Sequence, residues 1–259
     1  MIKVTVGGAT GRLGKAVCGI IASSDDMELV GAVVSDGGGN VGREIVPGLK
    51  AVGPDSAEEF IRKCDVYVDL TSPDAAAKLI ADVPSWGANL ILGTTAVPAD
   101  VLAALAANVS KFGTSAVSSA NFAIGVNVFW KTCADMAAAL PGYDIEIIEI
   151  HHGAKKDAPS GTAAETLRRL QEASGIADAV YGRQGVSGPR GREIGVHAVR
   201  AGDVIGDHTV IFAKNMERLE LTHRAVSREA FAEGCAASIR WVCGRKDGKV
   251  HSMEEVLGL

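Results

Sequence analysis

The residues of this chain best suited to chemistry lie in one short segment, Glu149-Ile-His-His-Gly-Ala-Lys-Lys-Asp-Ala-Pro-Ser-Gly-Thr162. The segment contains two imidazoles, two ammonium groups and a Pro-Ser-Gly-Thr run that is typical of the start of a helix. A histidine can donate a proton near neutral pH, and a lysine offers a compact positive charge to a carboxylate. The free N–H groups in the first turn of a helix bind anions. The segment therefore predicts a site for a small, multiply anionic substrate that must also receive a proton.

A strand and a helix must position this segment. The apolar run Ile145–Ile150 predicts a strand before it, and Ala163–Ala173 predicts a helix after it. Adjacent histidines at the end of a strand are often surface residues, and a Ser-Gly-Thr run is often only a helix cap. The combination favours a functional site, because the same chain begins with a pattern typical of nucleotide binding.

That pattern is a set of three glycines near the N-terminus. Gly8, Gly11 and Gly14 follow a short β-branched strand, Ile2–Val6, and precede a predicted helix, Lys15–Ala22. In a strand–turn–helix unit such glycines allow a tight turn, a close approach of the backbone to a pyrophosphate, and packing of the helix on the strand. The pattern predicts a dinucleotide-binding turn.

An acidic residue, Asp36, follows the next predicted strand, Leu29–Val34. It lies about twenty residues past the glycines, where a carboxylate would accept hydrogen bonds from the adenosine ribose. The alternative is a plain turn before Gly37–Gly39. We expect the ribose role.

Composition and charge narrow the class of protein. The net charge of −5 over 259 residues argues against non-specific binding of nucleic acid, and no apolar run is long enough to span a bilayer. The N-terminus enters a strand directly, so no signal peptide is expected. The five cysteines are scattered without a C-x-x-C pair. A reduced, cytoplasmic compartment and no structural metal are the simplest expectation.

The first half of the chain alternates strands and helices, a pattern that predicts a doubly wound parallel sheet. We expect a Rossmann-like dinucleotide-binding domain over residues 1–121, to which a C-terminal helical segment, 228–259, returns. Its later strands are predicted at Cys64–Leu70, Asn89–Leu92 and Gly113–Val117, and its later helices at Pro73–Ala81 and Pro98–Ala107. Ligands of such sheets lie beyond the carboxyl ends of the strands. Four loops occupy that position and should surround one crevice: Gly7–Leu13, Asp69–Pro73, Gly93–Thr95 and Ser118–Phe122.

The pattern changes over residues 122–227, which we expect to form a substrate-binding and oligomerisation domain. A helix is predicted at about Gly125–Ala139. It precedes the strand and the helix that flank the segment Glu149–Thr162. Three β-patterned runs without intervening helices follow it: Ile194–Arg200, Asp207–Ala213 and Arg218–Arg224. They predict an α+β domain built on a mostly antiparallel sheet. The glycine-rich and arginine-rich run Val180–Arg192 predicts a mobile loop.

These motifs together resemble the 4-hydroxy-tetrahydrodipicolinate reductase family, also called dihydrodipicolinate reductase, over essentially the whole chain. Glu149–Thr162 is similar to the family signature, which is highly specific. The other resembling motifs are Gly8–Gly14, Asp69–Pro73, Gly93–Thr95, Ser119–Phe122 and Val199–His208.

The resemblance implies a role for each residue of the signature. His151 would be the proton donor, and Lys155 the second catalytic group, which also holds a substrate carboxylate. His152 and Ser160 would bind substrate, and Gly161 and Thr162 would grip a carboxylate through their backbone N–H groups. The residues implied in cofactor binding are Gly8, Ala9, Thr10, Gly11, Arg12, Leu13, Asp36, Thr71, Gly93, Thr94, Thr95, Ser119, Ala120, Asn121 and Phe122.

The reaction implied by the resemblance is hydride transfer from NADH or NADPH to carbon 4 of a cyclic dicarboxylate, with loss of water, in lysine and diaminopimelate biosynthesis. Members are usually homotetramers joined through the sheet of the second domain, so a homotetramer is expected here.

Two positions depart from the family pattern. The family often has an arginine after the acidic residue of the second strand, where it meets the 2′-phosphate of NADPH. Here Ser35 takes the acidic position and Asp36 the arginine position, so we expect a preference for NADH. Arg12 still offers a cation. Ala123 replaces the serine that commonly follows Asn-Phe, which removes one hydrogen-bonding group near the cofactor.

Other classes of protein stay open on the residues alone. A related reductase acting on a different cyclic imine or keto acid would share most of these features. A sugar-type oxidoreductase would fit the first half, and a semialdehyde dehydrogenase would need a cysteine that the motifs lack. A redox-sensing NAD-binding module without catalysis would not need the proton-donor and anion-binding set.

Overall fold

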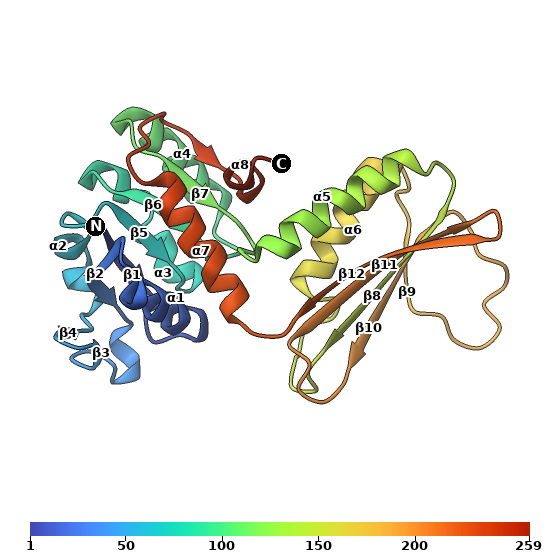
Figure 1. Ribbon diagram of the computed structural model, residues 1–259, viewed down its shortest axis with the longest axis horizontal. Coiled ribbons are helices and arrows are strands. Elements are labelled where there is room, and N and C mark those ends of the chain that lie inside the picture. The colour runs from blue at the N-terminus through green and yellow to red at the C-terminus, as the bar shows by residue number, and fades with distance from the viewer. The chain divides into compact units, whose positions relative to one another are not determined.

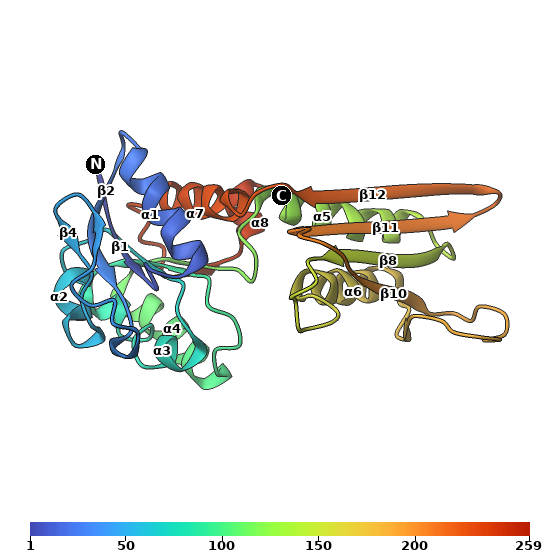
Figure 2. The same ribbon diagram turned by 90° about the horizontal axis from the view of Figure 1, so that it is seen from below.

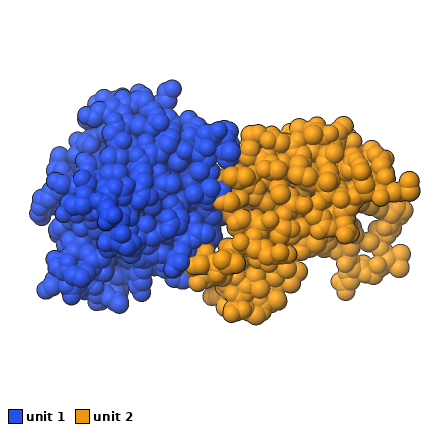
Figure 3. Space-filling view, viewed as in Figure 1, with its two compact units in different colours: residues 1–124, 229–259 blue, residues 125–228 orange.

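The computed structural model describes residues 1–259 and divides into two compact units. Unit 1 comprises Met1–Ile124 together with Glu229–Leu259, and unit 2 comprises Gly125–Arg228 (Figure 3). None of the helices is both long and apolar enough to cross a lipid bilayer.

Unit 1 is built on a six-stranded sheet in the order β13-β7-β6-β5-β1-β2, in which every pairing is parallel (Figure 1). The strands are β1 (Ile2–Gly7), β2 (Met27–Val33), β5 (Val66–Asp69), β6 (Asn89–Leu92), β7 (Ala116–Ser118) and β13 (Val250–His251). Every residue of β5 and β6 is buried, as expected for central strands of a parallel sheet that is covered on both faces. The doubly wound parallel sheet expected from the sequence is confirmed.

Two hydrophobic clusters fill the two faces of this sheet. Val66 and Val68 belong to one cluster and Tyr67, between them, to the other, because alternate residues of a strand point to opposite faces. The helices of the unit are α1 (Arg12–Ser23), α2 (Ala57–Ile61), α3 (Pro73–Ala77), α4 (Ala99–Phe112), α7 (Glu229–Val242) and α8 (Met253–Leu257). Helix α3 is shorter than predicted, since the chain tightens into turns and a 3-10 helix, η3 (Val83–Trp86).

Helix α7 packs beside α1 although more than two hundred residues separate them in sequence (Figure 1). Its approach to the loop after β7 is so close that a Cβ on Gly234 would lie 1.6 Å from the backbone oxygen of Phe122. The sequence pattern did not predict two further features, the hairpin of β3 (Glu44–Val46) and β4 (Leu49–Lys50) and helix α2. These elements are too short to show a reliable hydrophobic period.

Unit 2 has a five-stranded sheet in the order β12-β11-β8-β10-β9, and helices α5 and α6 cover one face of it (Figures 1 and 2). The elements are α5 (Ile124–Ala139), β8 (Asp144–His151), α6 (Gly161–Ser174), β9 (Ala179–Tyr181), β10 (Ile194–Arg200), β11 (Gly206–Lys214) and β12 (Glu217–Ala225). Burial alternates along β8, so Ile145, Ile147, Glu149 and His151 share the helix-covered face.

This sheet has a larger antiparallel part and a smaller parallel part. Strands β8, β11 and β12 pair antiparallel, but β10 is parallel to both β8 and β9. Helix α6 causes the difference, because it follows β8 and carries the chain back across the sheet before β9 and β10 begin. A crossover of this kind joins parallel strands. The second α+β domain expected from the sequence is confirmed.

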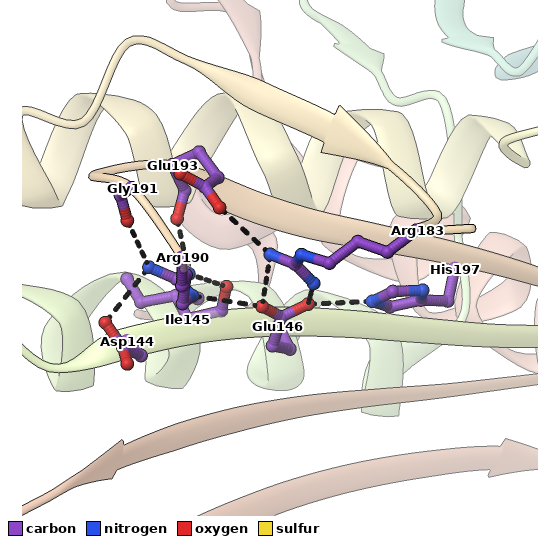
Figure 4. Close-up of polar contacts among 8 residues, drawn as sticks. All are labelled: Asp144, Ile145, Glu146, Arg183, Arg190, Gly191, Glu193 and His197. Atoms are coloured by element: carbon purple, nitrogen blue, oxygen red, sulfur yellow. Dashed lines mark hydrogen bonds and ion pairs between the residues drawn. The ribbon is translucent and has the colours of Figure 1, made fainter. Parts of the chain in front are cut away.

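Ionic contacts tie the two ends of the loop between β9 and β10, which was predicted to be mobile, to the sheet (Figure 4). Arg183 Nη2 lies 3.1 Å from Glu146 Oε1 and 3.0 Å from Glu193 Oε1. Arg190 contacts the same Glu146 carboxylate and Asp144. Two of the loop's arginines therefore meet one carboxylate on the face of β8 that the helices leave open.

Candidate functional site

The loops predicted to hold a cofactor follow neighbouring strands of unit 1. Strands β7, β6, β5 and β1 are adjacent in the sheet and run in the same direction, so the loops at their carboxyl ends lie along one edge. This edge is where ligands of doubly wound sheets bind.

The turn after β1 requires glycine at two positions. Gly8 has a φ of +76°, and a Cβ there would lie 2.3 Å from the backbone oxygen of Leu70. A Cβ on Gly14 would lie 2.1 Å from the backbone oxygen of Gly8, so the first turn of α1 packs directly on the loop. Helix α1 begins after Gly11, and no side chain caps it. Its first N–H groups are thus free for an anion, and the turn fits the pyrophosphate of a dinucleotide.

The loop residues do not all present side chains to a ligand. Ala9 is fully buried in the core, and Leu13 packs against the same cluster. The Ala9 side chain is therefore not available to a cofactor, whereas Leu13 keeps some exposed surface. Arg12 is exposed, whereas Thr10 is partly buried.

A buried carboxylate that was not predicted as a site residue joins two of these loops. Asp69 ends β5 with no exposed surface and accepts hydrogen bonds from Thr94 Oγ1 at 2.5 Å, Thr71 Oγ1 at 2.8 Å and Tyr67 Oη at 3.1 Å. The Leu70 N–H donates to the backbone oxygen of Gly7 at 3.1 Å. The signal that could have identified Asp69 is an acidic residue closing an apolar strand, followed by a threonine.

The remaining cofactor-loop residues are shaped by local bonds. Ser119 Oγ donates to the backbone oxygen of Asn121 at 2.7 Å, and Asn121 Oδ1 accepts from the Ala123 N–H at 2.9 Å. Phe122 is buried. A Cβ on Gly93 would lie 2.6 Å from Leu70 Cδ2 and 3.2 Å from Phe122 Cε2. Ala120 and Thr95 are exposed.

Asp36 lies in the 3-10 helix η1 (Asp36–Gly38) after β2, and its side chain is exposed. Its carboxylate is turned towards Gly53, where a Cβ would lie 2.5 Å from Asp36 Oδ1. Ser35 precedes the helix without capping it by a side-chain hydrogen bond.

In unit 2, the signature segment places Glu149 and His151 two residues apart on the buried face of β8. Glu149 has no exposed surface, and its Oε2 accepts a hydrogen bond from His151 Nδ1. Its Oε1 accepts from the Ser160 N–H at 3.2 Å and from Arg200 Nη2 at 2.9 Å. Burial by itself would raise the pKa of Glu149, but the bonds from Arg200 and His151 outweigh it and hold this pKa below its usual value.

The proposed proton donor, His151, is 8% exposed. His208 and Gly206 lie beside its ring. The ring of His208 meets it edge to face at 5.2 Å between centroids, and a Cβ on Gly206 would lie 3.0 Å from His151 Nε2. Burial lowers the pKa of His151 below its ordinary value; Glu149 opposes this shift, and Lys155 adds to it.

The start of helix α6 follows this pair. Ser160 is the N-cap, and its Oγ accepts from the Ala163 N–H at 3.1 Å and contacts His208 Nε2 at the same distance. A Cβ on Gly161 would meet no atom within 4 Å, so the helix start is open there. The Thr162 backbone oxygen accepts from Thr166 Oγ1 at 2.7 Å inside the helix.

The cationic residues of the segment lie on its loop. Lys155 is partly buried, with Nζ 2.9 Å from Asp157 Oδ2, and its backbone N–H donates to the His152 oxygen at 3.1 Å. His152 is half-buried, and Lys156 is exposed.

Arg200 and His208 were not predicted as site residues. Both fall in the run Val199–His208, so the resemblance of that run was the available signal. Their contacts with the signature segment arise only from the pairing of β10 and β11 with β8.

Comparison with known proteins gives a consistent result along the whole chain. Residues 2–122 match the family model "Dihydrodipicolinate reductase, N-terminus", and residues 125–257 match "Dihydrodipicolinate reductase, C-terminus". The 4-hydroxy-tetrahydrodipicolinate reductases of Methanosarcina mazei and Methanosarcina barkeri are 42% and 44% identical to this chain, and each alignment covers 100% of both proteins.

Solved structures agree with the sequence matches. The dipicolinate-bound dihydrodipicolinate reductase from Paenisporosarcina sp. TG-14 has a TM-score of 0.82 and 26% identity, covering 98% of each chain. A C. glutamicum DAP dehydrogenase in complex with DAP has a TM-score of 0.59 and 15% identity, covering 98% of this chain and 93% of that one. The similarity to the DAP dehydrogenase shows a shared fold and nothing more.

Proposed function

Because this chain belongs to the dihydrodipicolinate reductase family, we propose that it reduces 4-hydroxy-tetrahydrodipicolinate to tetrahydrodipicolinate with NAD(P)H in lysine and diaminopimelate biosynthesis. The observation that carries the proposal is the set around His151: a buried imidazole on a carboxylate, beside Lys155 and the open start of α6. This set suits a dicarboxylate that must receive a proton, and the relative of known structure that is 26% identical holds dipicolinate.

Unit 2 supplies the groups for the substrate. His151 donates the proton, and Lys155 holds a carboxylate once its contact with Asp157 is exchanged for the substrate. His152, Ser160 and the N–H groups of Gly161 and Thr162 complete the anion site. The free N–H groups of the helix start favour an anion there.

Unit 1 supplies the dinucleotide site, formed by the loops at the carboxyl ends of its parallel strands. The reduced nicotinamide provides the hydride when NAD(P)H is bound. Thr71 and Thr94, joined through Asp69, and the loop Ser119–Phe122 hold the nicotinamide end. The turn Gly8–Leu13 holds the pyrophosphate.

The choice between NADH and NADPH is assigned to Asp36. The exposed carboxylate would repel a 2′-phosphate, which carries about two negative charges near neutral pH, and would accept from the ribose hydroxyls of NADH. We expect a preference for NADH of about tenfold in kcat/KM, or roughly 1.4 kcal/mol. Asp36→Arg should shift the ratio towards NADPH, as measured by steady-state kinetics with both cofactors. Strong preference of the unaltered enzyme for NADPH would contradict this assignment.

The proposal includes a cytoplasmic homotetramer assembled through the sheet of unit 2. One face of that sheet is covered by α5 and α6, and the other carries partly exposed apolar side chains, among them Ile148, Ile150 and Ile211. Light scattering should give a mass about four times that of the 26.7 kDa chain.

An assay coupled to dihydrodipicolinate synthase tests the activity. Oxidation of NADH should depend on the synthase product. If NADH is not oxidised when that product is supplied, a related reductase or a sensing module is favoured.

His151→Gln and Lys155→Ala should each lower kcat by roughly 10²-fold or more, the scale for losing a general acid. The affinity for NADH should barely change, because both residues belong to unit 2. Normal turnover in both variants would remove these residues from the mechanism.

A further inference from the structure

Strand β8 carries a buried carboxylate that the reaction itself does not use. Glu149 lies two residues before His151, is fully buried, and accepts hydrogen bonds at both carboxylate oxygens. Its partners come from its own strand and from two other elements: His151 on β8, the Ser160 N–H at the start of α6, and Arg200 on β10. Such a carboxylate is fixed in place, because each of its oxygens is bound to the surrounding structure.

We infer that Glu149 is the positioning residue of this site: its carboxylate accepts the Nδ1–H of His151, so that Nε2 is the nitrogen that takes up and delivers the reaction's proton. This inference rests on the proposed function of His151. A neutral imidazole has one N–H donor and one acceptor nitrogen, and the bond made by one nitrogen decides the role of the other. A carboxylate can only accept, so it selects the tautomer with the proton on Nδ1.

The surroundings of the ring support the same assignment. Nε2 lies near Gly206, where even a Cβ would come within 3.0 Å, and His208 meets the ring edge to face. The ring is therefore confined at Nδ1 by Glu149 and at its other side by β11. A general acid gains from such confinement, because its proton must be aimed at one atom.

The charges around the ring also give Glu149 a second role. Lys155 from the loop and Arg200 from β10 are cations near His151, His208 from β11 is a buried imidazole, and burial itself disfavours the imidazolium. Glu149 is the nearby group that favours the protonated ring. Removing its charge should lower the pKa of His151 further and reduce the fraction of enzyme that can donate a proton.

The chain offers a matched control on the same strand. Glu146 lies on the opposite face of β8, and it too accepts from a histidine, His197 Nε2 at 2.7 Å, and from two arginines, Arg183 and Arg190 (Figure 4). Glu146→Gln removes the same charge from the same strand without touching His151.

The test compares Glu149→Gln with Glu146→Gln. In Glu149→Gln we expect kcat/KM for the substrate at pH 7.5 to fall by roughly 10- to 100-fold. The basic limb of its pH profile should move down by about one pH unit, since loss of the carboxylate lowers the pKa of the acid. The KM for NADH should not change. Glu146→Gln should keep the pH profile of the unaltered enzyme. Light scattering should give this variant the same mass as the unaltered enzyme, which shows that the assembly is intact. An unchanged profile in Glu149→Gln, or the same shift in both variants, would overturn the inference.

Nitrogen-15 NMR of the histidine rings provides a readout that needs no turnover. In the unaltered protein His151 should show a protonated Nδ1 and an unprotonated Nε2 at pH 8, and Glu149→Gln should lose this tautomer bias. A ring protonated on Nε2 in the unaltered protein overturns the inference even if Glu149→Gln does not fold. If the unaltered enzyme does not reduce the substrate, the proposed function fails, while the NMR result still decides whether Glu149 sets the tautomer.

Discussion

At the scale of single residues, the signature segment Glu149–Thr162 places one buried imidazole, His151, against a buried carboxylate and beside a second buried imidazole, His208. His151 and His208 lie edge to face at 5.2 Å, and only the first has a carboxylate partner. Nε2 of His208 contacts the Ser160 hydroxyl, while its Nδ1 is buried without a partner. Burial, reinforced by repulsion from His151, therefore lowers the pKa of His208 to about 3.

This low pKa predicts acid lability. The unfolded chain binds a proton at His208 near pH 6.5 and the folded protein does not, so stability is lost as the pH falls from about 6.5 towards 3. His208→Gln removes the titrating group. Between pH 6 and 5, urea unfolding should show that the variant loses about 1 kcal/mol less stability than the unaltered protein. Between pH 8 and 7 the two proteins should change equally, and equal losses in the acidic interval would contradict the assignment.

At the scale of elements, the proposed cofactor site of unit 1 depends on how closely helix α1 approaches the turn that precedes it. Gly14 and Gly19 lie on the same helix but have different surroundings. A Cβ on Gly14 would clash with the backbone oxygen of Gly8 at 2.1 Å, whereas a Cβ on Gly19 would meet no atom within 4 Å. The first glycine is required by packing, and the second only weakens the helix.

The two glycines give a paired prediction. Gly14→Ala must push the helix away from the turn, so it should weaken NADH binding at least tenfold, as measured by fluorescence titration, and lower the melting temperature. Gly19→Ala should raise the free energy of unfolding by about 0.5–1 kcal/mol, because alanine is the better helix former. Its NADH affinity should match that of the unaltered protein. Tight NADH binding by Gly14→Ala would show that the turn is not the cofactor site.

At the scale of the whole molecule, the two proposed functions are divided between the two units. Every residue assigned to the cofactor lies in Met1–Ile124, and every residue assigned to the substrate lies in Gly125–Arg228. A ligand that binds the proposed anion site of unit 2 should stabilise the folded protein by an amount that grows with the logarithm of the ligand concentration divided by its Kd.

Pyridine-2,6-dicarboxylate, a planar mimic of the substrate, tests this expectation. At about one hundred times its Kd it should stabilise the folded protein by roughly 2.7 kcal/mol, which thermal unfolding in the presence of NADH would detect. Pyridine-2-carboxylate lacks one of the two carboxylates and should give a smaller shift at the same concentration. Lys155→Ala should reduce the effect of the dicarboxylate. Equal shifts with both compounds would argue against a dicarboxylate site.

The sequence alone determined the features that depend on neighbours along the chain. The glycine turn and the strand over Ile145–Ile150 follow from spacing and residue type over a few positions. The helices were predicted from Lys15 and Ala163, close to their observed starts at Arg12 and Gly161. The doubly wound sheet followed for the same reason, since strands and helices alternate over the first half. The signature segment could be identified before any strand was paired.

The tertiary structure alone decided which distant groups complete the site. Arg200 reaches Glu149 from 51 residues away and His208 reaches Ser160 from 48, because β10 and β11 flank β8 in the sheet. The parallel course of β10 and the contacts of Arg183 with Glu146 arise in the same way. Local periodicity predicts that a strand forms, but the register and order of strands depend on side-chain packing across the whole sheet, which no short stretch of sequence contains.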